Sequence, residues 1–180
     1  MKRNYACSQI LFHWLVFIAI VIAYAAMELK GFTPKGSPAR VTMALVHYNA
    51  GFSVLLLMIV RVVLKITHRD PEIIPPPPRW QIVMSKATHG LLYLMFLVLP
   101  FLGIASLYYG QIEWSFFGIK MPVATSLNTD TQHFLKEIHE LIASAGYFLI
   151  GFHTLGALFH HYFVRDNTLL RMLPLINRHK

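Results

Sequence analysis

Four long apolar stretches constrain this chain more than any other feature of its sequence. They lie at residues 8–27, 42–64, 88–108 and 138–163. Each is long enough to cross a hydrocarbon core of about 30 Å as a helix, which needs roughly 20 residues. None alternates polar and apolar residues, and in lipid only helices or closed barrels satisfy the backbone. The sequence therefore predicts an all-α fold, an integral membrane four-helix bundle that forms one transmembrane domain over residues 1–180.

Positive charge predicts how the bundle is oriented. Of the sixteen Lys and Arg residues, eleven fall near the two termini or in the segment from Arg61 to Lys86. Because Lys and Arg are retained on the cytoplasmic side of membranes, we expect both termini in the cytoplasm. The net charge of +8 is then explained by membrane topology. We therefore expect membrane lipid as a partner and no nucleic acid.

The first stretch has an alternative interpretation as a secretory signal peptide. Lys2 and Arg3 precede the apolar run, which ends in Ala23-Tyr24-Ala25, an A-x-A pattern. The apolar region of a signal peptide is usually about 7 to 15 residues long, and this run is longer. We therefore favour a retained transmembrane helix.

Histidines occur in every predicted span and at matching depths. The outer level holds His47 and His139. The inner level holds His13, His89, His153 and His160. On a helix, His139 and His153 differ by only about 40° in direction and roughly 21 Å in height. The spacing predicts one stripe with two levels, where His47 faces His139 and His13 is available to face His153.

Two imidazoles from different helices, one on each side of a planar macrocycle, are the ligands of a six-coordinate b-type haem. Structural zinc requires four ligands, and the lone Cys7 provides no thiolate cluster. A single intramembrane histidine is often a hydrogen-bonded packing residue. Four histidines at two depths are harder to explain in that way, so the pattern predicts two haem b groups. Gly51, Gly146, Gly151 and Gly156 lie near the paired histidines and are expected to leave room for them.

Three further residues at the inner level have more than one interpretation. Arg61 follows His47 by fourteen positions, so it shares the face of His47 at the inner level, where it would either pair with haem propionates or extend to the headgroups. His89 and His160 would either ligate haem or act catalytically, by passing protons to a quinone. For His89, a hydrogen-bonded packing role is equally open.

Several short strings over almost the whole chain carry a resemblance to a known family: His13-Trp14-Leu15-Val16, Ala26-Met27-Glu28, Gly31-Phe32, Ile73-Ile74-Pro75, Met121-Pro122, His160-His161-Tyr162-Phe163 and Asp166-Asn167-Thr168-Leu169-Leu170-Arg171-Met172. Together they resemble bacterial cytochrome b561, and the C-terminal string is the most specific. The resemblance implies a multi-pass protein of the bacterial inner (plasma) membrane.

The same resemblance implies two b haems, one ligated by His13 with His153 and the other by His47 with His139. It also implies a superoxide oxidase that takes electrons from superoxide at the periplasmic face and reduces ubiquinone. One alternative is a cytochrome subunit that relays electrons between quinone and a redox protein partner, such as a dehydrogenase or hydrogenase. Another is a haem-free transporter or structural protein.

Overall fold

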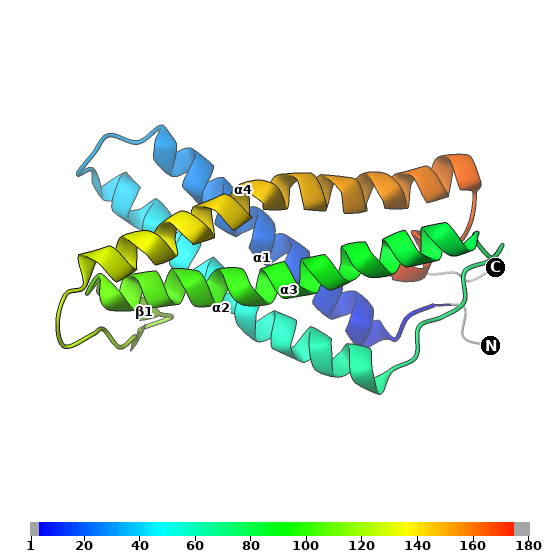
Figure 1. Ribbon diagram of the computed structural model, residues 1–180, viewed down its shortest axis with the longest axis horizontal. Coiled ribbons are helices and arrows are strands. Elements are labelled where there is room, and N and C mark those ends of the chain that lie inside the picture. The colour runs from blue at the N-terminus through cyan, green and yellow to red at the C-terminus, as the bar shows by residue number, and fades with distance from the viewer. Residues whose placement is uncertain (1–3, 175–180) are drawn as a thin grey trace.

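The computed structural model describes residues 4–174 as four long helices that run along one axis (Figure 1). The helices are α1 (Cys7–Gly31), α2 (Pro38–Thr67), α3 (Arg79–Tyr109) and α4 (Thr129–Phe159). All four are long and apolar enough to cross a membrane. The predicted membrane four-helix bundle is confirmed. Lys2 and Arg3 lie outside the described residues.

Each helix is longer than the span predicted for it, most clearly α3, which begins at Arg79 rather than at residue 88. An apolar stretch marks the part of a helix inside hydrocarbon, whereas the backbone ladder continues into polar flanks until a capping residue ends it. Ser37 caps α2 by accepting a hydrogen bond from the Arg40 amide, and Asn128 caps α4 by accepting one from the Thr131 amide.

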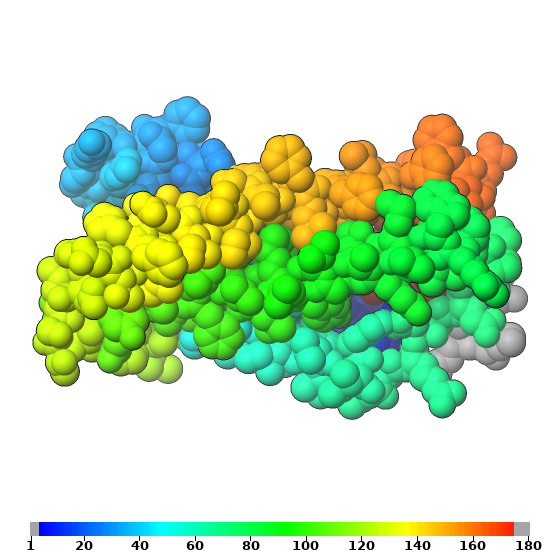
Figure 2. Space-filling model, in the orientation of Figure 1, coloured from blue at the N-terminus to red at the C-terminus, as the bar shows by residue number. Residues whose placement is uncertain are grey.

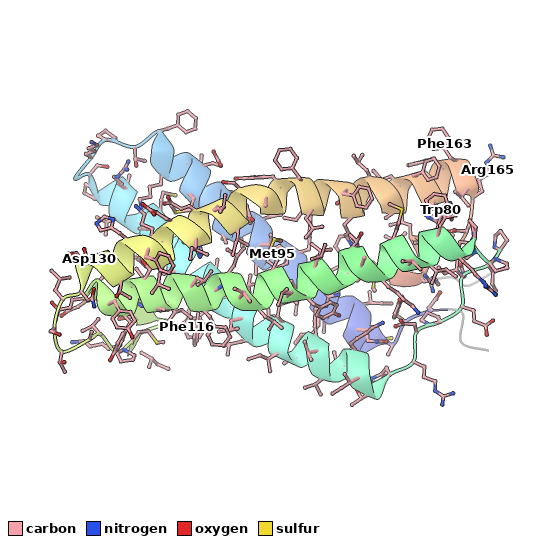
Figure 3. All side chains as sticks on the ribbon, viewed as in Figure 1. Trp80, Met95, Phe116, Asp130, Phe163 and Arg165 are labelled. Carbon is pink, nitrogen blue, oxygen red and sulfur yellow. The ribbon has the colours of Figure 1, made fainter. Side chains whose placement is uncertain are left out.

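The bundle has two chemically different ends. Figure 1 shows the start of α1, the connector 68–78 and the segment 165–174 together at one end, which we call the terminal end. The loop 32–37 and a small β hairpin lie at the opposite end, which we call the hairpin end. In the side-chain view, Asp130 marks the hairpin end and Arg165 the terminal end, with Met95 midway between them (Figure 3).

The β hairpin pairs β1 (Ser115–Phe116) with β2 (Ile119–Lys120) and was not predicted. Its two turn residues, Phe117 and Gly118, have φ values of 45° and 90°. Such a tight turn with positive φ at both positions suits the twist of two antiparallel strands. Asn49 of α2 holds the hairpin through hydrogen bonds to the Ser115 carbonyl and the Phe117 amide.

The helices pack mainly as two pairs, α1 against α2 and α3 against α4, with α2 also contacting α3. A central cluster of buried apolar residues joins the pairs: Val16, Ala19, Val54, Met58, Met95, Phe96 and Leu99. Toward the terminal end, the space-filling surface is hollowed between α3 and α2, and α1 is visible at the floor (Figure 2). Most side chains on the outer faces are large and apolar, as lipid contact requires.

One tyrosine links α1 to α4 across the gap between the two pairs. The Tyr24 hydroxyl donates a hydrogen bond of 2.9 Å to the Ala143 carbonyl. A Cβ placed on Gly146 would lie 2.3 Å from that hydroxyl oxygen, so no larger residue fits there without displacing Tyr24. Gly146 was expected to leave room beside a ligand histidine, and this expectation is wrong because Tyr24 occupies the space.

We expect Gly146→Ala to lower the free energy of unfolding by about 1–3 kcal/mol, as overpacking does. The loss should shrink in a Tyr24→Phe background, where the clashing oxygen is absent. Thermal unfolding in detergent measures both effects. Gly31→Ala is the matched control, because no atom of residues 4–174 lies within 4 Å of its added Cβ. If Gly146→Ala lowered the free energy of unfolding equally in both backgrounds, the clash with the Tyr24 hydroxyl would not be its cause.

Candidate functional site

The first candidate site lies toward the hairpin end, where His47 of α2 faces His139 of α4. Their ring centroids are 6.0 Å apart. The Nδ1–H of His47 donates to the Ala23 carbonyl at 2.9 Å, and the Nδ1–H of His139 donates to the Leu99 carbonyl at 2.9 Å. A carbonyl oxygen only accepts, so each proton sits on Nδ1 and each Nε2 keeps a free lone pair. This is how metal-ligating histidines are oriented.

The position of His139 depends on a glycine that sequence analysis did not single out. A Cβ on Gly103 of α3 would lie 3.2 Å from Cε1 and 3.3 Å from Nδ1 of His139. The missing side chain therefore lets the imidazole lie against α3 and reach the Leu99 carbonyl one turn earlier. Because Gly103 is distant from His139 in sequence, only the packing of α3 on α4 reveals its role.

The second candidate site lies toward the terminal end, where His13 of α1 faces His153 of α4. Their ring centroids are 6.3 Å apart. His13 Nδ1 is buried and has no hydrogen-bond partner among residues 4–174. His89 of α3 is also close, with its centroid 5.1 Å from that of His153. Its Nδ1–H donates to the Ser85 carbonyl at 2.7 Å.

The ring separations of these histidines differ. A bond from a metal to an imidazole nitrogen is about 2.0 Å, and the nitrogen lies about 1.1 Å from its ring centre. Two rings in line on either side of one iron therefore have centroids about 6.2 Å apart. The His47–His139 and His13–His153 pairs match this spacing, whereas His89 is too close to His153. The two pairs, each from two separate helices, fit the axial ligands of b-type haem.

Three of the glycines near these histidines border open space. A Cβ added to Gly51, Gly151 or Gly156 would meet no atom of residues 4–174 within 4 Å. Gly51 is one turn after His47, and the other two flank His153. Room beside the ligands is therefore present at these positions, in contrast to Gly146.

Arg61 lies on α2 and is half-buried, with its guanidinium carbon 5.2 Å from the centre of the Tyr93 ring on α3. Among residues 4–174, no carboxylate forms a salt bridge with Arg61. A charge in this position normally has an anionic partner. Arg61 therefore brings an uncompensated positive charge between α2 and α3.

His160 directly follows α4 at the terminal end. It is not a member of either facing histidine pair. It begins η1 (His160–Val164), a single turn of π-helix, and its Nδ1–H donates to Asp166 at 2.5 Å. Asp166 stands in the string that carries the family resemblance, but sequence analysis gave it no role. A carboxylate six residues after a histidine has no fixed position until the intervening turn is known.

A basic cluster lies at the hairpin end near His47. It consists of Lys30, Arg40 and Lys136. Arg40 and Lys136 both lie close enough to Lys30 to repel its charge, Glu140 attracts it, and Lys30 in turn is close enough to His47 to act on it. Arg40 is fixed by hydrogen bonds of 3.0 Å from its Nη1 to the carbonyls of Lys30 and Thr33. Positive charge beside a pocket raises the local concentration of anions.

Comparisons with known proteins identify the family. The profile of prokaryotic cytochrome b561 matches residues 4–175. Cytochrome b561 homolog 1 of Escherichia coli (strain K12) is 46% identical over 172 residues, which cover 96% of this chain and 98% of the relative. The probable superoxide oxidase CybB of Yersinia pestis is 40% identical over 174 residues, covering 97% and 98%. Cytochrome b562 of Cereibacter sphaeroides is 28% identical over 177 residues, covering 96% of each chain.

The family match agrees with the four apolar helices and with facing imidazoles that suit haem iron. It establishes a bacterial membrane protein of electron transport that binds b-type haem. The chain belongs to the prokaryotic cytochrome b561 family.

Proposed function

We propose that this protein oxidises superoxide at the hairpin end and reduces ubiquinone at the terminal end. Two superoxide anions each give up one electron and leave as dioxygen. One ubiquinone takes up the two electrons and two protons to become ubiquinol. The observation that carries the proposal is the presence of two facing imidazole pairs, one toward each end of the bundle. Similarity to a probable superoxide oxidase adds support.

The ring separations support the ligand assignment. His47 and His139 hold one haem b, and His13 and His153 hold the other. When bound, haem supplies one-electron transfer through its iron. Because two imidazoles would hold each iron, substrates are expected to exchange electrons with the haem without binding to the metal.

Arg61 is the residue we assign to the acid groups of the haem at the terminal end. Its guanidinium lacks a carboxylate partner among the described residues. A buried or half-buried cation is costly until an anion neutralises it. Two propionates would supply that charge, while the Tyr93 ring supports the guanidinium from the other helix.

At the hairpin end, Lys30, Arg40 and Lys136 provide the attraction for an anionic substrate. Glu140 neutralises part of this charge through a 3.6 Å pair with Lys136. Lys30 and Arg40 form no salt bridge with a carboxylate of residues 4–174. Superoxide, a monoanion, would therefore be drawn toward the side of the bundle that holds His47.

Protons for quinone reduction would enter at the terminal end, where His160 and His89 lie beyond or beside the second imidazole pair. We assign this end to the cytoplasm of a bacterial inner membrane, because it carries most of the Lys and Arg residues among residues 4–174. The hairpin end would then face the periplasm, where superoxide arrives.

Rapid mixing of the oxidised, purified protein with superoxide tests the proposal. We expect the reduced haem absorbance to rise without quinone, and ubiquinol to form when ubiquinone is present. The rate with superoxide should fall as ionic strength rises, because salt screens the basic cluster. Protein that dithionite reduces but superoxide does not would contradict the superoxide assignment and favour a relay subunit for a redox partner.

Replacing the histidines one at a time tests the ligand pairs. Alanine at His47 or His139 should remove one haem per chain, and alanine at His13 or His153 should remove the other, because one imidazole alone holds iron poorly. His89→Ala should retain both. Haem content and reduced-minus-oxidised spectra measure the outcome.

His133→Ala, at an exposed position of α4, is the matched control for loss of an imidazole. It should leave both haems in place. Loss of a haem in His89→Ala together with full haem content in His13→Ala would contradict the assignment at the terminal end.

A further inference from the structure

A buried carboxylate lies immediately beyond the end of α4. The chain leaves α4 through η1, and then Arg165 adopts a left-handed conformation with φ of 59°. This turn carries Asp166 back against the start of η1. The Nδ1–H of His160 donates to Oδ2 of Asp166 at 2.5 Å, and the Asp166 side chain is 0% exposed.

The carboxylate is held in place by backbone on both sides. Its second oxygen, Oδ1, accepts a hydrogen bond of 2.8 Å from the Thr168 amide. The Asp166 amide donates to the His160 carbonyl at 3.2 Å, which closes the turn. The carboxylate is therefore fixed relative to the ring of His160.

The turn is also fixed to the rest of the terminal end. The Ile74 amide donates to Oδ1 of Asn167 at 2.9 Å, and the Asn167 amide donates to the Ile74 carbonyl at 3.2 Å. Arg171, which is buried, donates from Nη1 to the Pro71 carbonyl. These bonds join the segment after η1 to the connector 68–78, so the His160–Asp166 pair belongs to an ordered part of the molecule.

The charge state of Asp166 follows from its surroundings. Burial raises the pKa of Asp166, but the hydrogen bonds from His160 and Thr168 outweigh burial and lower the pKa below its usual value. An ionised carboxylate that accepts from Nδ1 fixes the orientation of the imidazole and opposes the positive charge that the ring carries whenever Nε2 also holds a proton. His89 differs, because its Nδ1–H donates to a neutral backbone carbonyl.

We propose that Asp166 is a positioning residue that makes His160 the proton donor for quinone reduction at the terminal end. This inference rests on the proposed function. As a ubiquinone carbonyl oxygen gains an electron, an O–H bond forms there and the Nε2–H bond of His160 breaks. Asp166 stays ionised throughout. Water at the terminal end returns a proton to Nε2, and the carbonyl oxygen on the opposite side of the quinone ring takes the second proton from water at the same end.

Asp166→Asn tests the inference, because asparagine keeps the shape of the side chain and removes its charge. We expect unchanged haem spectra and unchanged haem reduction by superoxide. The quinone-dependent kcat should fall by about tenfold or more, a part of the roughly 10²–10⁴-fold that general acid catalysis contributes, while KM for ubiquinone stays the same. Asp70→Asn is the matched control: it removes a half-exposed carboxylate at the same end and should have no effect.

A double-mutant cycle separates positioning from a general structural effect. His160→Gln removes the transferable proton but keeps an N–H that donates to Asp166. If both residues act as one unit, the double variant should be no slower than His160→Gln alone. Additive losses would overturn the inference. Should Asp166→Asn lose haem, Asp166→Glu decides, because it keeps the charge and should recover most of the wild-type rate.

The outcomes also separate this inference from the proposed function. Wild-type protein that forms no ubiquinol from superoxide overturns both. Wild-type protein that forms ubiquinol, with Asp166→Asn equally fast, overturns only the role of Asp166.

Discussion

The structure depends on one constraint, the cost of leaving a polar group without a partner inside hydrocarbon. At the hairpin end the constraint is met by giving each imidazole one backbone carbonyl, from Ala23 for His47 and from Leu99 for His139. Each bond fixes one nitrogen and leaves the other free to face the opposite ring. The requirement for hydrogen bonding thus also creates a preorganised pair of metal ligands.

Helix pairing determines which residues meet. Because α1 packs on α2 and α3 on α4, each ligand pair combines a helix of the first pair with α4 of the second. Haem would then bind between the two helix pairs. It would add contacts between α4 and the first pair, where the polypeptide itself makes few. Tyr24, through its bond to Ala143, is a direct link between α1 and α4.

Much of this arrangement was predictable from sequence. The four spans follow from hydrophobic length, and helical spacing at matching depths placed His47 opposite His139. At the inner level the spacing left His89 and His160 open beside His13 and His153, and only the family resemblance implied the pairing of His13 with His153. The role of Gly103, the occupation of the space at Gly146 and the turn that returns Asp166 to His160 were not predictable. Each depends on a contact between elements or on backbone conformation after a helix ends, and neither leaves a periodic signal in one sequence.

The two ends differ in charge and therefore in chemistry, with free cations near His47 and a buried carboxylate beside His160. Attraction of superoxide at the hairpin end and proton donation to quinone at the terminal end both require that each imidazole pair holds its own haem. The most direct measurement is the ratio of extractable haem b to polypeptide in the purified protein. The account predicts two haems per chain. A ratio of one or less in fully folded protein would contradict it.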